Sequence, residues 1–106
     1  MNAIMIKSFA DKKTEAFWNG ERVRQFHAVK RTAYRRLDFL NEATRLEDLQ
    51  RVPGHRFEAL SGKRKGQYSI RINDQWRVCF GWQKDSTSQT KGTPGDPILV
   101  EIVDYH

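Results

Sequence analysis

The sequence predicts a single α+β domain over residues 1–106, in which two N-terminal helices cover one face of a small antiparallel sheet of four to five strands. Three observations support this class. Apolar residues recur at helical spacing in the first half of the chain, they alternate at strand spacing between residues 57 and 82, and an apolar run, ILVEIV, lies near the end. Helices followed by a series of strands are typical of α+β domains, and a chain of this length buries one core.

The first elements are predicted from short local signals. Ala3 to Phe9 is apolar and β-branched, which predicts a first strand, although Met5 is an equally good natural start. Asp11 is placed to cap the N-terminus of a helix that Asn19 and Gly20 end.

A second, longer helix is predicted from about Arg24 to Ala43. Its apolar stripe consists of Val29, Ala33, Leu37 and Leu40, and the cations around that stripe are Lys30, Arg31, Arg35 and Arg36. Spacings of four, four and three residues keep the stripe on one side of the helix. The cations have two interpretations, a solvated helix face or a flank that meets RNA, the ribosome or an acidic protein.

Between the helices and the strands, Thr44 followed by Glu47 has the form of a capping box, which predicts a short helix through Leu49. Pro53 and Gly54 then end the helical half of the chain.

The stretch from Phe57 to Trp82 predicts an antiparallel pair of strands preceded by a short strand and a basic, glycine-bounded loop, Gly62–Gly66. Gln67–Ile72 alternates in polarity, and Asn73-Asp74 predicts the turn that follows it. The apolar face carries Tyr68, Ile70, Ile72, Trp76, Val78, Phe80 and Trp82, and the other face carries Ser69, Arg71 and Arg77. We expect the polar face to be uncovered and to carry the function.

Two segments complete the predicted sheet. Gln83 to Pro97 has no large apolar residue and is predicted to be an exposed, mobile loop. Ile98 to Val103 is strongly apolar, which predicts a strand in the centre of the sheet.

Composition narrows the class of partner. Lysine and arginine exceed the acidic residues to give a formal net charge of +6, and a basic surface favours a polyanion such as nucleic acid. The single cysteine, Cys79, is expected to be a packed side chain, and His27, His55 and His106 lack the spacing of metal ligands. We expect no metal, no cofactor and no membrane segment, and a cytoplasmic location.

Side chains on the polar face and at its rim could cleave RNA without a metal. A phosphate could be held by the cations Arg77, Arg71, Lys63, Arg64 and Lys65, protons could be carried by His106, Asp104 and Glu58, and a base could stack on Tyr105. RNA supplies its own nucleophile, the 2′-hydroxyl, so that orientation, an acid, a base and cations suffice.

Structural explanations compete with each of these roles. Arg77 could pair with Glu101 across the strands, a terminal His106 could be frayed, and Glu58 could be structural. Trp76, Trp82 and Tyr68 are expected in the core.

The motif LSG-x-R-x-G-x-x-SIR-x-NDQWR-x-CF, the ending VEIVDYH and the early MIKSF together resemble HigB-type toxins of the RelE/ParE superfamily of toxin–antitoxin systems. The resemblance covers nearly the whole chain. It implies a RelE-like fold and a ribosome-dependent, metal-independent mRNA endonuclease that acts in the A site through the 2′-hydroxyl. It also implies a helix-turn-helix antitoxin (HigA-like) as partner, and binding to operator DNA only as the toxin–antitoxin complex.

The resemblance assigns roles to individual residues. Arg77 matches the arginine on the scissile phosphate, Arg64 matches a loop cation, and Asp104, Tyr105 and His106 match the terminal catalytic residues.

This chain also departs from the family pattern. Glu58 and Ser61 stand where better-known members have histidine and lysine, which implies an altered proton carrier and weaker toxicity. The polar insertion between the last two strands implies altered docking on the ribosome.

Other functions remain open from the sequence. The chain could be a non-catalytic inhibitor that binds the ribosome, gyrase or another target, an antitoxin-dependent DNA-binding co-repressor, or a housekeeping RNA-binding subunit. The DYH ending favours the nuclease.

Overall fold

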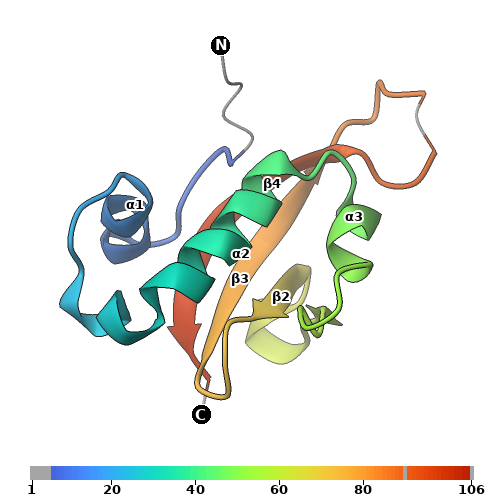
Figure 1. Ribbon diagram of the computed structural model, residues 1–106. Helices are drawn as coiled ribbons and strands as arrows, with labels where there is room; N and C mark the ends of the chain where they lie inside the picture. The colour runs from blue at the N-terminus through green and yellow to red at the C-terminus, as the bar shows by residue number, and fades with distance from the viewer. Residues whose placement is uncertain (1–5, 90, 106) are drawn as a thin grey trace.

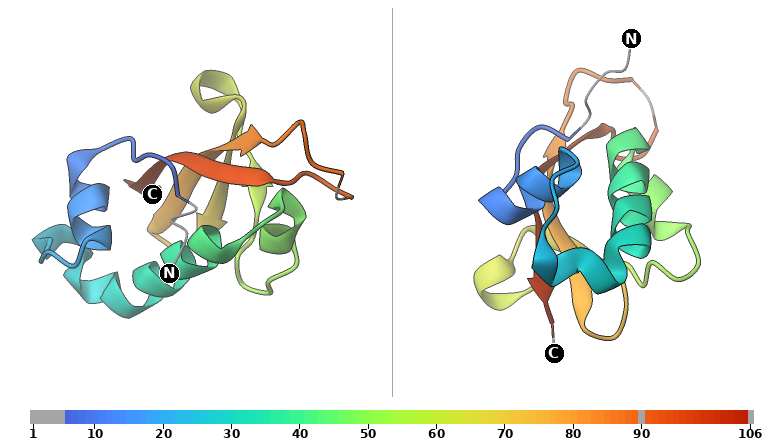
Figure 2. Two further views of the ribbon diagram at one scale, coloured as in Figure 1. Left: turned by 90° about the horizontal axis from the view of Figure 1, so that it is seen from above. Right: turned by 60° about the vertical axis from the view of Figure 1, so that its left-hand side comes forward.

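The computed structural model describes residues 6–89 and 91–105, and it confirms the predicted α+β class (Figure 1). The elements, in chain order, are α1 (Lys12–Trp18), the 3₁₀ helix η1 (Arg24–Val29), α2 (Lys30–Glu42), α3 (Leu46–Gln50), β1 (Glu58–Ala59), the 3₁₀ helix η2 (Gly62–Arg64), β2 (Gln67–Arg71), β3 (Trp76–Lys84) and β4 (Gly95–Asp104). The four strands form one antiparallel sheet in the order β1-β2-β3-β4. Figure 2 shows α1, η1 and α2 on one side of this sheet and η2 on the other.

The core lies between the helices and the sheet. Ala33, Leu37 and Leu40 of α2 are fully buried, as are Val78 and Phe80 of β3. Burying one leucine side chain contributes roughly 1.5–3 kcal/mol, so the stripe on α2 accounts for much of what holds this helix on the sheet. The predicted stripe and the apolar sheet face therefore meet as expected.

The first helix ends as its sequence predicts. The Asp11 carboxylate accepts a hydrogen bond from the N–H of Thr14 at 3.0 Å, and Gly20, with φ 92°, ends the turn that follows α1. The buried hydroxyl oxygen of Thr14 accepts from the N–H of Ile102 at 3.0 Å. This bond ties α1 to β4 across a long separation in the chain.

The predicted helix over residues 24–43 is present, but its first turns are 3₁₀ rather than α. At the junction Val29 has φ −112° and ψ 12°, which lies outside α-helical geometry. Within η1 the ring of Phe26 is buried, and it packs edge-on against Phe17 and Trp76.

The prediction that the last strand is central is wrong. β4 pairs with β3 on one side, and on the other it contacts the N-terminal segment and α1 rather than a further strand of the described sheet. Residues 3–5 of the predicted first strand lie outside the described residues, and Ile6–Phe9 forms a single parallel bridge, between Phe9 and Val100, instead of a regular strand. Leu99 has φ 52° and donates its N–H to the hydroxyl of Ser8, which interrupts a regular ladder.

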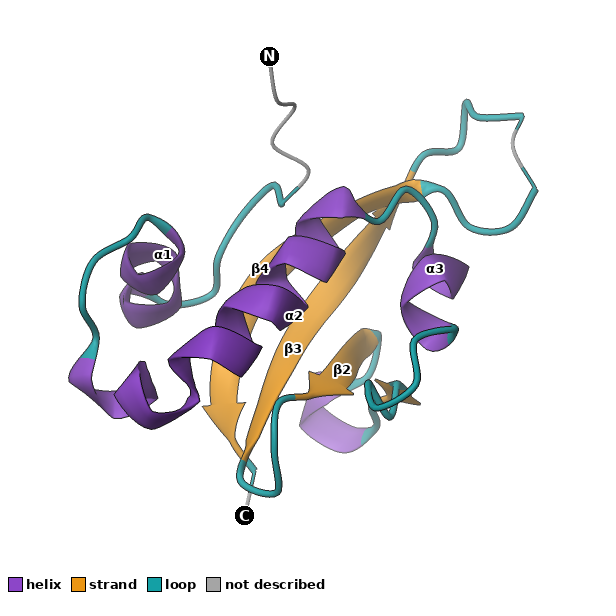
Figure 3. Cartoon of the chain, viewed as in Figure 1, coloured by secondary structure: helices purple, strands orange, loops and turns teal. Residues whose placement is uncertain are grey.

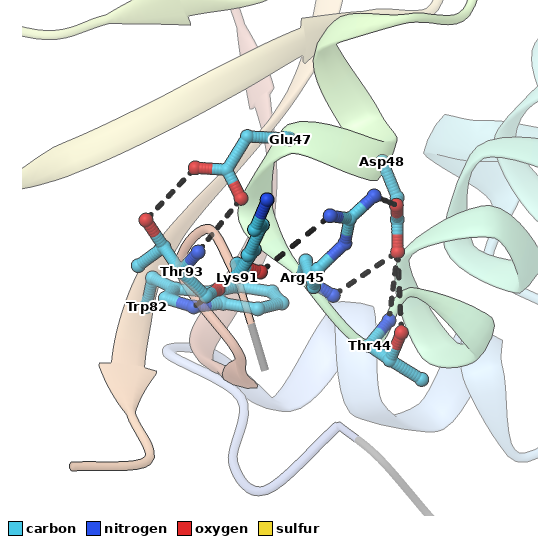
Figure 4. Close-up of polar contacts among 7 residues, drawn as sticks. All are labelled: Thr44, Arg45, Glu47, Asp48, Trp82, Lys91 and Thr93. Carbon is cyan, nitrogen blue, oxygen red and sulfur yellow. Dashed lines mark hydrogen bonds and ion pairs between the residues drawn. The ribbon is translucent and has the colours of Figure 1, made fainter. Parts of the chain in front are cut away.

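The prediction of a mobile loop over residues 83–97 is also wrong at both ends. β3 continues to Lys84, β4 begins at Gly95, and Trp82 is opposite Pro97, so the connection shortens to residues 85–94. Figure 4 shows how its returning arm is held by α3: Glu47 accepts from both the N–H and the hydroxyl of Thr93, at 2.8 Å each. The indole N–H of Trp82 donates to the Thr93 carbonyl at 3.0 Å.

The capping box at α3 is displaced by one residue from its predicted position. Arg45 is the N-cap, and the Asp48 carboxylate accepts from the N–H groups of both Thr44 and Arg45 (Figure 4). Glu47 is therefore left to bind Thr93, and the hydrogen bonds that it accepts there lower the pKa of its carboxyl.

His55 is fully buried behind the turn at Pro53 and Gly54. Its Nδ1 lies 3.0 Å from the carbonyl of Leu49, to which it must donate, and Nε2 has no hydrogen-bond partner in the described chain. The ring also packs edge-on against Phe39, 5.2 Å between centroids. Burial, together with the charge of Arg36, lowers the pKa of this imidazole, although its bond to Leu49 acts in the opposite direction.

Acid should therefore destabilise the fold through His55. Since its pKa is lower in the folded chain, the unfolded chain binds the proton first, and stability declines as the pH falls below the ordinary value of about 6.5. Urea denaturation of the parent should show a loss of about 1 kcal/mol between pH 7.5 and 5.5 from this group. His55→Asn, which keeps a donor toward Leu49, should be less stable at pH 7.5 but show a smaller decline. Equal declines in the two proteins would contradict the assignment.

The two hydrogen bonds between Thr93 and Glu47 anchor the β3–β4 hairpin to α3, and their removal should increase local opening of the hairpin. Glu47→Ala removes both hydrogen bonds to Thr93, and at about 0.5–1 kcal/mol each the open population should rise at least about fivefold. Limited proteolysis within residues 85–94 reports this opening. Glu42→Ala, which removes an exposed carboxylate from α2, serves as the control and should be cleaved at the parental rate. Unchanged cleavage in Glu47→Ala would show that the hairpin does not depend on the anchor.

Candidate functional site

The polar face of the sheet lies opposite the helices, on the side where η2 stands (Figure 2). Ser69 on β2 and Arg77 on β3 both face this side by strand alternation, since their neighbours Ile70 and Val78 are in the core. The sequence thus predicted the correct side for these two residues.

Arg77 is the centre of this face, and it is buried rather than bare. Its side chain is 10% exposed. Nε donates to the Ser69 hydroxyl at 2.8 Å, and Nη2 donates to the carbonyl of Arg56 at 2.5 Å and lies 3.5 Å from the carboxylate of Glu58. The expectation of an uncovered face is therefore wrong at its centre, because residues 56–58 cover the guanidinium and pair with it.

Arg56 supplies its carbonyl from a special backbone conformation. Its φ of 43° is left-handed, which is uncommon for a residue other than glycine, and its side chain is exposed. Such conformations gather at functional sites, where the surroundings hold them in place. Nothing in the sequence pattern indicated this backbone acceptor.

Tyr105 lies over the same guanidinium from the end of β4. The carbon of the Arg77 guanidinium is 5.7 Å from the centroid of the Tyr105 ring, and the tyrosine is 41% exposed. A cation and an aromatic face at this distance attract each other, while the outer face of the ring stays open to solvent. The predicted meeting of Arg77 and Tyr105 is confirmed, whereas His106 lies outside the described residues.

Glu58 is positioned by β1. It stands opposite Ser69 in the β1–β2 register and reaches Arg77, but its side chain is 56% exposed. The carboxylate is therefore a partner of the arginine that remains accessible to a proton donor or a substrate.

Arg64, on η2, forms a second pair on this face. Its guanidinium lies 3.5 Å from each carboxylate oxygen of Glu101 and donates to the amide oxygen of Gln67 at 3.0 Å. Burial works against the charged form, but Glu101 raises the pKa of Arg64 above its ordinary value. The alternative pairing of Arg77 with Glu101 is thus wrong, because Glu101 pairs with Arg64 and Glu58 takes its place at Arg77.

The other predicted RNA-binding cations lie at the rim. Lys63 and Lys65 are exposed on and beside η2, as is Ser61, and neither lysine forms an ion pair within the described residues. Arg71 stands opposite Arg77 in the β2–β3 register, but its guanidinium pairs with Asp74 at 2.5 Å.

Asp104 does not join the cluster. It stands opposite Trp76 and has the parity of Ile102, which faces the helices, and it lines a cavity of about 250 Å³ together with Asp11 and Phe26. Its carboxylate accepts from the amide of Gln75 at 3.1 Å. The expectation that Asp104 shares a site with Arg77 is wrong, because one residue along a strand reverses the face.

The remaining chemical groups have structural positions. Cys79 is fully buried, and burial raises the pKa of its thiol. Tyr68, Trp76 and Trp82 pack against the core as predicted. Within the described ranges no three histidine, cysteine or acidic side chains lie close enough to hold a metal ion, and no helix there has the length and apolar character to cross a membrane.

Comparison with known proteins identifies the family of this chain. The family model described as the RelE-like toxin of the type II toxin-antitoxin system HigB matches residues 7–91. Toxin HigB-1 of Vibrio cholerae serotype O1 (strain ATCC 39315 / El Tor Inaba N16961) is 36% identical over 80 residues, which cover 74% of this chain and 84% of that protein. The chain is therefore a RelE-like toxin of the HigB family of type II toxin–antitoxin systems.

Proposed function

We propose that this toxin is an endoribonuclease that cleaves mRNA in the ribosomal A site, with the RNA 2′-hydroxyl as nucleophile and no metal ion. The observation that carries the proposal is the Arg77 guanidinium, fixed by Ser69 and Arg56 with the ring of Tyr105 beside it on the helix-free face. A fixed cation stabilises the charge that develops on a phosphate without having to reorganise during the reaction.

The substrate would approach at the open edge of this cluster. The scissile phosphate binds the Arg77 guanidinium next to the Glu58 carboxylate, and an unpaired base stacks on the exposed side of Tyr105. Contacts to neighbouring phosphates come from the cations of the η2 side, Arg64, Lys63 and Lys65, and from Arg71 at the far end of β2.

In the reaction the 2′-oxygen attacks phosphorus and the 5′-oxygen of the next nucleotide leaves, which gives a 2′,3′-cyclic phosphate and a free 5′-hydroxyl. One group accepts the 2′-hydroxyl proton and another protonates the leaving oxygen. Glu58 has the accessible position for the first role, and His106, next to Tyr105 in the sequence, is proposed for the second. Asp104, on the opposite face, is left out of this mechanism.

A requirement for the ribosome is consistent with the shape of the molecule. Cavities of about 260, 220 and 250 Å³ lie at the α1–η1 junction, between α2 and α3, and beside Asp104, and none of these three includes Arg77. Tyr105 and Glu58 are both well exposed at the candidate site, so we propose that the ribosome completes it and holds the message in position. Action at the A site would take place in the cytoplasm.

Membership of a type II system implies an antitoxin partner. We propose a helix-turn-helix antitoxin of the HigA kind, and operator binding only by the toxin–antitoxin complex.

Substitution at the central arginine tests the nuclease. On induction in cells, Arg77→Ala and Tyr105→Ala should reduce mRNA cleavage, the first by about 10²–10³-fold, as for loss of a donor that stabilises transition-state charge. Mapping of 5′ ends on translated messages measures the effect. Lys12→Ala, an exposed cation on α1, is the control, and urea denaturation verifies that each variant folds. Growth arrest by the parent with intact messages would instead support a non-catalytic inhibitor.

The variant Glu58→Gln distinguishes two roles of Glu58, that of a proton acceptor in the reaction and that of an ion-pair partner of Arg77 alone. The amide keeps the size of the side chain and a hydrogen-bond acceptor toward the guanidinium but cannot take a proton at neutral pH. If Glu58 is the base, the cleavage rate on programmed ribosomes should fall by about 10²–10⁴-fold. A rate equal to or above that of the parent would show that the carboxylate only competes with phosphate for Arg77.

A further inference from the structure

The largest of these three cavities, about 260 Å³, is lined by the residues between α1 and α2. Figure 3 shows this stretch of chain as the loop and short helix that lead from α1 to α2, at the left of the view. Phe17, which is buried, and Val23, which is half-buried, form its apolar floor. The exposed side chains of Arg22, His27 and Lys30 stand at its rim, with Glu21. The cavity is smaller than most ligand pockets, so it suits one planar ring or one side chain rather than a whole cofactor.

Within the described residues, the cations around this cavity outnumber its one carboxylate, Glu21, and they are not paired with it. Arg22, Lys30 and the adjacent Arg24 and Arg31 carry no ion pair within residues 6–89 and 91–105. On the sheet face, by contrast, Arg64, Arg71 and Arg77 each pair with a carboxylate. The helix-side cations are therefore available to neutralise phosphates without first losing a partner.

We propose that this cavity and its cationic rim form a second RNA-binding site, in which an unpaired base enters above Phe17 and Val23 while Arg22 and Lys30 bind the flanking phosphates. The apolar floor suits the face of a base, and the Glu21 carboxylate can accept from the amino or imino groups that bases carry. An acidic peptide carries no amino or imino donors on a flat ring, so the same carboxylate has no partner there. The inference rests on the proposed function in taking RNA as the target.

The location explains how a small toxin could be held among several RNA segments. The cavity belongs to α1 and η1, which cover the face of the sheet opposite η2 and Arg77 (Figure 2). One RNA segment would be cut on the sheet face while another is bound on the helix side, so the second site contributes affinity and orientation and takes no part in the bond cleavage.

The test is binding of the purified full-length toxin to a single-stranded, mixed-sequence RNA oligonucleotide that contains 4-thiouridine. Arg22→Ala/Lys30→Ala should weaken binding at least tenfold relative to Lys12→Ala/Lys84→Ala, which removes the same charge elsewhere on the surface. The salt dependence, d log K/d log[salt], should decrease in magnitude by about 1.4 for the two lost phosphate contacts. Photocrosslinks to the parent should map within residues 17–30.

Equal affinities of the two double variants, or crosslinks confined to the sheet face, would overturn the second site, as would binding of poly-glutamate in preference to RNA. Cleavage on programmed ribosomes distinguishes this outcome from failure of the nuclease proposal. If the parent binds RNA through residues 17–30 but cuts no message, the second site holds and the nuclease fails. If the parent cuts messages and the two double variants bind RNA with equal affinity, the nuclease proposal holds and the second site fails.

Discussion

The burial of one guanidinium inside a small sheet governs how the site is arranged. A charge removed from water is tolerated only when it is paired and hydrogen-bonded, and Arg77 finds its partners in three separate parts of the chain. Ser69 comes from the neighbouring strand, Arg56 and Glu58 come from the segment at β1, and Tyr105 comes from the end of β4. A strand of two residues such as β1 has little stability of its own, and the contacts of Arg56 and Glu58 with Arg77 help to hold it at the edge of the sheet.

The arginines on the sheet face and the cations on the helix side differ in whether they are paired with carboxylates. On the sheet face Arg64, Arg71 and Arg77 are held by carboxylates, so their orientations are fixed in advance and phosphate must compete for them. On the helix side the cations around η1 are exposed and have no such partners within the described chain. Paired arginines with fixed orientations suit the precise positioning of a single phosphate. Unpaired, exposed cations suit the general attraction of a polyanion.

Glu58 combines two properties at the edge of the site. Its carboxylate is a counter-ion of Arg77, and it is also 56% exposed, so solvent and ligands can reach it. A ligand that binds Arg77 therefore changes the charge balance at Glu58 as well.

Elements whose causes are local could be predicted from the amino-acid sequence alone. Residues a few positions apart determine the apolar stripe of α2, the Asp11 cap and the alternation of β2 and β3. The cap was predicted at the correct residue, and the stripe and the alternation were predicted with the correct sides facing the core. The motif around Arg77 and the DYH ending likewise indicated the family.

The meeting of distant groups, by contrast, is set by the register of the strands and by contacts across the fold. These put β4 at the edge of the sheet, turn Asp104 toward the helices, cover Arg77 with residues 56–58 and bring Glu47 to Thr93. Local periodicity carries no information on such contacts, because a shift of one residue in a strand reverses the face of every side chain without changing the pattern itself.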